Sequence, residues 1–148
     1  MNPGQLEALR AIPEFMDRAV TELIRYDSPV QMHGRSALSD VEFGGQVIPA
    51  GSKVILLVGS ANRDPDRYPE PERLWLDRPG PPGTSFGGGV HHCLGEAFAR
   101  LEAKIALGML VTELDIAGPT GGPARWRADQ VAIRGLASLL VTIRPRQH

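Results

Sequence analysis

The residues best suited to chemistry lie in the stretch FGGGVHHCLG, residues 86–95. It holds the only cysteine of the chain, Cys93, just where a long segment of helical periodicity begins. The unpaired N–H groups and the positive dipole end of a helix N-terminus favour thiolate over thiol. Three consecutive glycines before it let the backbone bend sharply and approach a bulky flat group closely. These features are typical of a metal ligand or a nucleophile.

Other interpretations of Cys93 stay open on these residues alone. A lone cysteine is most often a buried structural residue. Zinc is disfavoured, because the adjacent His91, His92 and Cys93 cannot easily all turn toward one tetrahedral ion and no second ligand pair follows. A cysteine nucleophile needs a base and an orienting partner, and the sequence leaves that possibility open. The glycines predict neither a phosphate loop nor a dinucleotide-binding turn, since the residues that complete those motifs are missing.

Helices and short strands must position this stretch. Apolar residues at helical spacing predict helices over residues 5–11 and 13–26, separated by Pro13. The segment from about Cys93 to Leu114 predicts a long helix, with an apolar face and an ion pair between Glu96 and Arg100 at i, i+4. Turn residues and β-branched runs predict the strands, which are expected at 41–43, 46–48, 53–58, 131–133 and 139–143. Residues 60–85 are rich in turn formers and predict a long functional loop.

Bulk properties exclude several classes of function. The chain has 148 residues, a formal net charge of -1 and one cysteine. Without a basic excess, nucleic acid is not expected as a partner. One cysteine allows neither an internal disulfide nor a four-thiolate iron–sulfur cluster, and it suits a cytoplasmic location. No apolar run approaches membrane-spanning length and the first residues do not look like a secretory leader, so no membrane association is expected.

The stretch at residues 86–95 resembles the cysteine-ligand loop of the cytochrome P-450 family, Phe-x-x-Gly-x-His/Arg-x-Cys-x-Gly. The fixed positions match at Phe86, Gly89, His91, Cys93 and Gly95. Upstream, Glu22 and Arg25 match the family's Glu-x-x-Arg helix motif, and the i, i+3 spacing puts both side chains on one helix face. The resemblance covers nearly the whole chain. It implies an α+β fold, the C-terminal portion of the cytochrome P-450 fold, with residues 1–148 as a single truncated heme-binding domain.

The resemblance also implies roles for the residues of the loop. Cys93 is expected to be the thiolate ligand to the iron of a non-covalently bound heme b, with Phe86 packed beneath the porphyrin. The loop glycines that complete the heme-binding set are Gly87, Gly89 and Gly95. Arg35 and His91 are expected to hold the two heme propionates, since arginine suits planar carboxylates. His92 falls at a variable position and is expected to be a surface residue without a ligand role.

Outside the loop, the resemblance implies a structural triad and two substrate-contact segments. The triad would join Glu22 and Arg25 to an arginine in the irregular stretch 71–78. Arg73 is the expected member, with Arg78 as the alternative; Leu74 stands where the family usually has Phe. The expected substrate contacts are Val30, Gln31, Met32, Leu136 and Ala137.

The activity implied is insertion of one oxygen atom from O2 into a small apolar substrate. Electrons would come from NAD(P)H through its reductase and a ferredoxin-type partner. Full-length family members have a large N-terminal portion with a long acid-threonine helix over the distal side of the heme, and no such segment occurs in this sequence. The isolated chain is therefore expected to be inactive, with exposed apolar faces that bind the missing portion or another copy. The alternative is a catalytically silent heme-binding remnant or scaffold.

Overall fold

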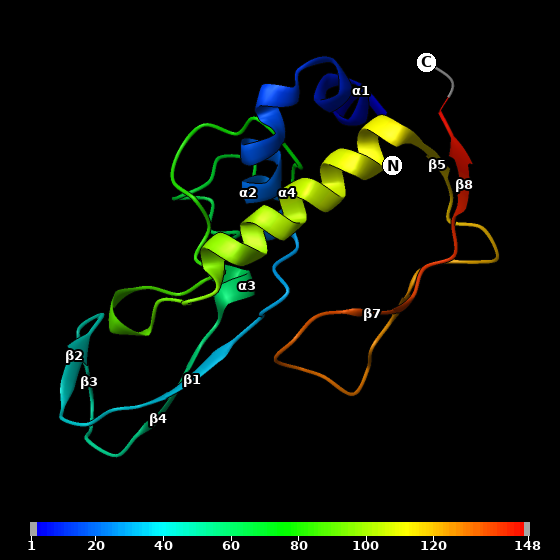
Figure 1. Ribbon diagram of the computed structural model, residues 1–148. Helices are drawn as coiled ribbons and strands as arrows, with labels where there is room; N and C mark the ends of the chain where they lie inside the picture. Colours follow the sequence, from blue (N-terminus) through cyan, green and yellow to red (C-terminus); the bar gives the residue numbers. More distant parts are fainter. Residues whose placement is uncertain (1–2, 147–148) are drawn as a thin grey trace.

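A computed structural model describes residues 3–146 and arranges them around one long helix, α4 (Glu96–Glu113), which runs diagonally across Figure 1. The other helical segments are α1 (Pro3–Ala11), η1 (Pro13–Phe15), α2 (Met16–Tyr26), α3 (Val58–Ala61) and η2 (Gly89–His91). The strands are β1 (His33–Ser36), β2 (Val41–Phe43), β3 (Gln46–Ile48), β4 (Lys53–Leu56), β5 (Leu114–Ala117), β6 (Arg125–Trp126), β7 (Leu136–Ser138) and β8 (Thr142–Pro145). The expected α+β class is confirmed.

The strands form four antiparallel pairs: β1 with β4, β2 with β3, β5 with β8, and β6 with β7. The expected strands at 41–43 and 46–48 are confirmed with their turn at Gly44-Gly45, where both glycines have positive φ. The C-terminal strands differ from the prediction. Ile133 makes only a single bridge to Val30, and β8 pairs with β5. Strand β5 follows α4 directly and was not predicted; the predicted helix ended at Leu114, which is the first residue of this strand.

The two helical predictions before the strands are confirmed. Pro13 lacks an N–H and therefore ends the pattern of α1, and a single 3-10 turn leads from it into α2. The long helix begins three residues later than expected, at Glu96, with Gly95 as its N-cap. Cys93 therefore lies just outside the helix, and its carbonyl accepts the N–H of Glu96 (3.3 Å).

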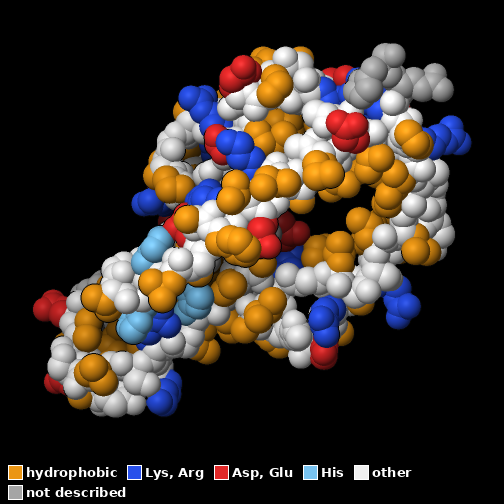
Figure 2. Space-filling view, in the orientation of Figure 1, with side chains coloured by type: hydrophobic (Ala, Val, Ile, Leu, Met, Phe, Trp, Pro, Cys, Tyr) orange, Lys and Arg blue, Asp and Glu red, His pale blue; other side chains and the backbone are white. Residues whose placement is uncertain are grey.

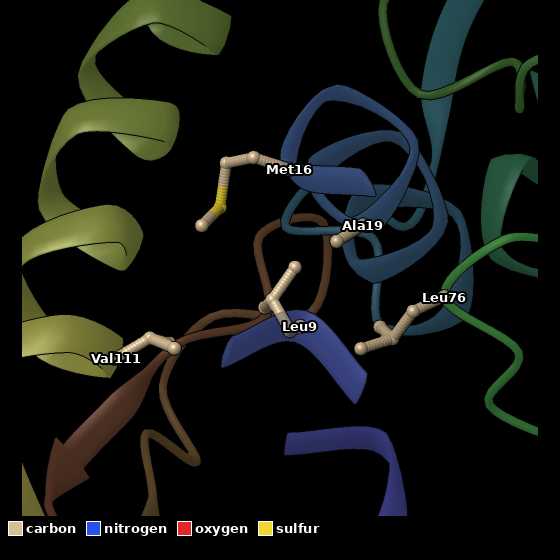
Figure 3. Packing of buried hydrophobic residues seen from close by; sticks show 5 residues of the cluster. All are labelled: Leu9, Met16, Ala19, Leu76 and Val111. Atoms are coloured by element: carbon tan, nitrogen blue, oxygen red, sulfur yellow. The ribbon is translucent and has the colours of Figure 1, made fainter. Parts of the chain in front are cut away.

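The apolar core lies where α1, α2 and α4 meet a segment of the long loop. Figure 3 shows its buried side chains, which are Leu9, Met16, Ala19, Leu76 and Val111. Arg10 ties the first helix to the end of the last one: its Nε donates to the carbonyl of Val111 (3.1 Å) and its Nη2 to that of Leu114 (3.1 Å). These bonds satisfy carbonyls that the C-terminus of α4 would otherwise leave unpaired. Within residues 3–146, no helix is both long and apolar enough to cross a membrane.

Candidate functional site

The cysteine loop is closed on itself by backbone hydrogen bonds. The N–H of Cys93 donates to the carbonyl of Phe86 (2.9 Å), and the N–H of Gly87 donates to the carbonyl of Thr84 (2.9 Å). Gly87 and Gly89 have φ values of +72° and +61°. Residues with a Cβ rarely adopt this left-handed region, so the two glycines permit the bend that brings Cys93 back beside Phe86. The predicted sharp bend is confirmed at Gly87 and Gly89, whereas Gly88 is extended, and close approach to a flat group stays a prediction.

The closed loop presents Cys93 to solvent among apolar side chains. Cys93 and His91 are exposed, and Val90 and Leu94, one on each side, are almost completely exposed. Large apolar side chains at full exposure are unfavourable in water and indicate a surface that binds something. The interpretation of Cys93 as a buried structural residue is wrong. Within residues 3–146, no three His, Cys, Asp or Glu side chains come together as a metal site, so the zinc interpretation gains no support.

A cation lies over the ring of Phe86. The guanidinium of Arg100 lies 5.1 Å from the centre of the Phe86 ring. Arg100 also donates to Glu96 (2.7 Å) and to Thr21 of α2 (2.9 Å), which confirms the expected Glu96–Arg100 pair. The hydrogen bond from Arg100 lowers the pKa of Glu96, burial opposes that effect, and nearby His92 adds to it. His92 lies on the surface, 2.5 Å from Glu96.

The Glu-x-x-Arg pair is buried and bidentate. Glu22 is 3% exposed and Arg25 is 2% exposed. Nε of Arg25 donates to Oε2 of Glu22 (2.7 Å), and Nη2 donates to Oε1 (2.8 Å). Burial raises the pKa of Glu22, but hydrogen bonds from Arg25, the N–H of Trp75 and Arg78 outweigh it, so the pKa lies below its usual value. The expected pairing of Glu22 with Arg25 on one helix face is confirmed.

The third member of this cluster is Arg78, and the expectation of Arg73 is wrong. Nε of Arg78 donates to Oε1 of Glu22 (3.0 Å), and the Arg78 side chain is 5% exposed. Arg73 is 54% exposed and pairs with Glu70 (3.2 Å). The chain turns at 70–73 and again at 75–78, which leaves Arg73 beside Glu70 in its own turn and brings Arg78 back onto α2. Arg78 also donates to the carbonyls of Glu70 and Arg73, so it organises the irregular segment.

A second buried polar cluster, which the sequence prediction missed, joins α2 to the start of the cysteine loop. Asn62 is completely buried. Its Oδ1 accepts the N–H of Thr84 (2.6 Å) and its Nδ2 donates to the hydroxyl of Ser85 (2.9 Å). The hydroxyl of Ser85 donates to the carbonyl of Ile24 in α2 (3.0 Å). Arg25 connects the two clusters, because its Nη1 donates to the carbonyl of Asn62 (2.7 Å).

The two expected propionate ligands lie on different elements. Arg35 is half-buried on β1, opposite Val54 of β4. Within the described residues, its side chain donates only to the carbonyl of Gly34 (2.8 Å), which leaves further N–H groups for another acceptor. His91 is exposed at the end of η2, inside the cysteine loop. The structure shows no contact between Arg35 and His91, and their roles toward heme stay predictions.

The two expected substrate segments run side by side. Val30 bridges Ile133, and the N–H of Gln31 donates to the carbonyl of Ala132 (2.8 Å). Gln31 and Met32 line one hollow of about 350 Å³ together with residues of the 126–135 stretch. Leu136 and Ala137 follow in β7 and are exposed. The assignment of all five to substrate contact stays a prediction.

Helix α4 carries an uncovered row of large apolar side chains, called here the apolar stripe: Phe98, Leu101, Ile105 and Met109. Each is between 53% and 66% exposed. Figure 2 shows apolar side chains along α4 and around a hollow between this helix and the C-terminal strands. The opposite side of α4 contacts the rest of the chain, where Arg100 and Lys104 bond to α2 and Val111 enters the core. The expectation of exposed apolar faces is confirmed.

The sequence analysis predicted only part of these contacts. It paired Arg100 with Glu96 but did not predict the position of Arg100 over the Phe86 ring, and it named Arg78 only as the alternative to Arg73. Asn62 and Arg78 lie in the irregular 60–85 segment, where no periodicity says which side chains point inward. For them, the available signal was only the run of polar residues in a segment expected to be functional.

Comparisons with known proteins agree with this geometry. The family model described as cytochrome P-450 matches residues 5–129. The chain is similar to cytochrome p450 CYP199A2 of Rhodopseudomonas palustris, with 39% identity over 97% of this chain and 34% of that protein. It is also similar to a vitamin D(3) 25-hydroxylase of Pseudonocardia autotrophica, with 40% identity over 98% of this chain and 36% of that protein. The chain thus spans about a third of the length of these relatives.

Solved structures give the same result. The crystal structure of P450BioI in complex with an acyl carrier protein carrying hexadec-9Z-enoic acid matches with a TM-score of 0.86 and 39% identity, over 96% of this chain and 37% of that one. CalO2 matches with a TM-score of 0.88 and 35% identity, over 97% of this chain and 36% of that one. The sequence and the fold both match those of known cytochromes P-450 over nearly the whole chain. The chain therefore belongs to the cytochrome P-450 family.

Proposed function

We propose that this chain binds heme b through the thiolate of Cys93 and forms the heme-binding part of a monooxygenase. The observation that carries the proposal is the exposed sulfur on a closed, braced loop. Cys93 lies free of partners in its own chain beyond its backbone bonds, within the described residues, while the residues before it are tied to α2. A soft, accessible sulfur on a fixed backbone suits a resident iron.

The surroundings of Cys93 fit a large, flat, apolar group. Val90, Leu94 and Phe98 lie within five residues of Cys93 in the chain and are exposed. A ring system bound across the loop would bury them. A Cβ added at Gly88 or Gly89 would meet nothing within 4 Å, so the loop surface there is open. Burial of this apolar area would stabilise the bound state by about 25 cal/mol per Å².

Cys93, Phe86 and His91 of the loop, together with Arg35 of β1, each have a defined role in this proposal. Heme ligated by a thiolate would supply the electron-rich iron that favours cleavage of the O–O bond. The hydrogen bond from the Cys93 N–H to the carbonyl of Phe86 fixes the backbone that carries the sulfur. The Phe86 ring would shield one side of that sulfur. Arg35 and His91 would hold the propionates by charge and hydrogen bonding. Both are accessible enough for that role.

The substrate, the electron donors and the partner are proposed from membership of the family. The substrate would be small and apolar, approached by Val30, Gln31 and Met32 and by Leu136 and Ala137. Electrons would come to the bound heme from NAD(P)H through a reductase and a ferredoxin-type protein in the cytoplasm. We further propose that the apolar stripe binds the portion that relatives have and this chain does not span. Residues 1–148 would then act as one domain of a larger assembly.

A second candidate is a silent heme-binding remnant or scaffold. It is favoured by the exposure of Cys93 and of the apolar stripe, since the described residues provide no cover over the sulfur. A monooxygenase must exclude bulk water to deliver electrons to product. We therefore expect the 148-residue chain alone to convert electrons from a surrogate ferredoxin system into hydrogen peroxide. Tight coupling of electron consumption to hydroxylated product in this chain would contradict that expectation.

The heme proposal is tested by reconstitution with hemin, reduction and addition of carbon monoxide. The parent chain should show the red-shifted Soret band of thiolate ligation. Cys93→Ala should lose this band, whereas His92→Ala, a matched change at the neighbouring surface histidine, should retain it. A thiolate-type band that survives in Cys93→Ala, or that is absent from the parent, would disprove the assignment.

A further inference from the structure

Asn62, at the C-terminal end of α3, contacts the residues at the base of the cysteine loop, and the sequence analysis predicted none of these contacts. Asn62 is completely buried and directs both ends of its amide at residues 84 and 85, immediately before Phe86. We propose that Asn62 is a positioning residue for the Cys93 thiolate, acting through Thr84, Ser85 and Phe86. This inference rests on the proposed heme function but gives a role to a residue outside the cysteine-loop and Glu-x-x-Arg motifs.

The first step of the argument is the number of bonds on one amide. Oδ1 of Asn62 accepts both the N–H of Thr84 (2.6 Å) and its hydroxyl (3.0 Å), while Nδ2 donates to Ser85 (2.9 Å). A completely buried amide with an unmatched donor or acceptor is strongly unfavourable. Asn62 therefore fixes the position of two consecutive loop residues, and no hydrophobic side chain of similar size could do the same.

The second step is that Asn62 is itself held in place. Its carbonyl accepts Nη1 of Arg25 (2.7 Å), and its N–H donates to the carbonyl of Val58 (3.0 Å). Arg25 is in turn fixed by the bidentate pair with Glu22. Asn62 thus connects the buried ion-pair cluster directly to the residues before the cysteine loop.

The third step is the close approach of the loop to α2. A Cβ added at Gly83 would lie 2.9 Å from Oδ1 of Asn62 and 3.1 Å from Cβ of Arg25. The hydroxyl of Ser85 bonds to the carbonyl of Ile24, and the hydroxyl of buried Tyr68 donates to the carbonyl of Pro82 (3.1 Å). The segment from Pro82 to Ser85 is therefore clamped on several sides.

The last step connects this clamp to the sulfur. From Ser85 the chain continues to Phe86, whose carbonyl accepts the N–H of Cys93 (2.9 Å). A shift of residues 84–86 would move that carbonyl, and with it the backbone that carries the thiolate. Asn62 lies 31 residues before Cys93 in sequence, but two hydrogen bonds and the short segment from Thr84 to Phe86 connect them.

The test compares Asn62→Leu, a change of similar volume without the amide, with Leu9→Ala in the distant apolar core. Amide hydrogen exchange of the heme-free 148-residue chain is the first measurement. Asn62→Leu should speed exchange of the Thr84, Gly87 and Cys93 amides about tenfold or more beyond the change that Leu9→Ala causes there. Equal changes in the two variants would show a merely structural role and overturn the proposal.

Two milder variants keep the test decisive if Asn62→Leu does not fold. Ser85→Ala removes the partner of Nδ2, and Thr84→Val removes only the hydroxyl bond to Oδ1. Both should speed exchange in residues 84–93 selectively, and unchanged exchange there in both would contradict the proposal.

A second measurement uses hemin-loaded protein. Asn62→Leu, or Ser85→Ala in its place, should convert part of the thiolate-type carbon monoxide band into the unshifted form, while Leu9→Ala lowers heme content without changing the band shape. A variant band of the parent's shape would overturn the positioning role. A parent without the thiolate band would instead disprove the heme proposal, and the heme-free exchange data would still test Asn62 as the anchor of the loop.

Discussion

Two regions of this chain differ in whether their side chains have partners within it. One is formed by the buried polar clusters behind the cysteine loop, and the other is the apolar stripe on α4. Behind the loop, Glu22, Arg25, Arg78 and Asn62 satisfy one another, and within residues 3–146 no buried side-chain nitrogen or oxygen lacks a hydrogen-bond partner. The stripe has no such partners, and its four side chains are more than half exposed. The chain thus completes its own polar frame and leaves its apolar surface to something else.

This difference predicts different consequences of mutation in the two regions. Removal of one member of a buried ion pair leaves an uncompensated charge, at a cost of about 3–5 kcal/mol. Replacement of an exposed apolar side chain removes no packing within the chain, and its effect should appear in association instead. The polar frame should therefore control folding, and the stripe should control what the chain binds.

The largest effect is expected for Arg25→Ala. Arg25 is 2% exposed and donates to Glu22, Asn62 and Pro71, so its removal leaves Glu22 buried with fewer donors. The free energy of unfolding should fall by about 3–5 kcal/mol, which would leave much of the chain unfolded. Urea denaturation followed by circular dichroism measures this. A variant that unfolds at the parent's urea concentration would show that the buried cluster does not hold the fold.

The next largest effect is a difference in stability between variants of the two arginines in the irregular segment, Arg78 and Arg73. Arg78→Ala removes a side chain that is 5% exposed and bonded to Glu22, and should destabilise the chain by about 2–4 kcal/mol. Arg73→Ala is its matched control, because Arg73 is 54% exposed, pairs with exposed Glu70 and, like Arg78, lies over the Trp75 ring. That variant should change stability by less than about 1 kcal/mol. Equal losses in both, measured in the same denaturation assay, would reverse the assignment of the triad.

These two arginines mark a region where the sequence was not sufficient, whereas it was sufficient in the cysteine loop and in α2. Gly87, Gly89 and Cys93 could be interpreted directly, since the loop depends on local backbone conformations that residue types encode. The Glu22–Arg25 pair followed from helical spacing, which fixes which side chains share a face. Arg78 and Asn62 could not be chosen, because residues 60–85 have no repeating geometry and the inward direction of each side chain depends on contacts with distant α2. Strand β5 was missed for a related reason: its partner β8 lies far along the chain.

A smaller effect is expected in the pH dependence of stability. The folded-state pKa of Glu22 lies below its ordinary value of 4.5, so the unfolded chain binds this proton more readily. The stabilisation is thus fully present above about pH 4.5 and is lost as the pH falls through the lower folded-state pKa. Glu22→Gln should be less stable at neutral pH and should lose less stability on acidification than the parent. Parallel acid profiles of the two proteins would contradict the lowered pKa.

The smallest effect on stability, and the sharpest test of the comparison, is expected for the apolar stripe. Leu101→Gln with Ile105→Gln replaces two half-exposed side chains on the side of α4 that faces away from α1 and α2. Because neither belongs to the apolar core, each change should alter the free energy of unfolding by no more than about 0.5 kcal/mol.

The same pair of changes should act on association. Exposed apolar rows drive self-association in water, so the parent should form concentration-dependent oligomers in light scattering and the double variant should form fewer. Glu102→Gln, at an exposed polar position of the same helix, is the matched control and should behave like the parent. If the double variant unfolds while the control does not, the stripe contributes to this chain's own core, and the contrast with the polar frame fails. If it stays folded and loses association, the stripe is an unfilled interface, as expected for a chain that spans a third of its relatives' length.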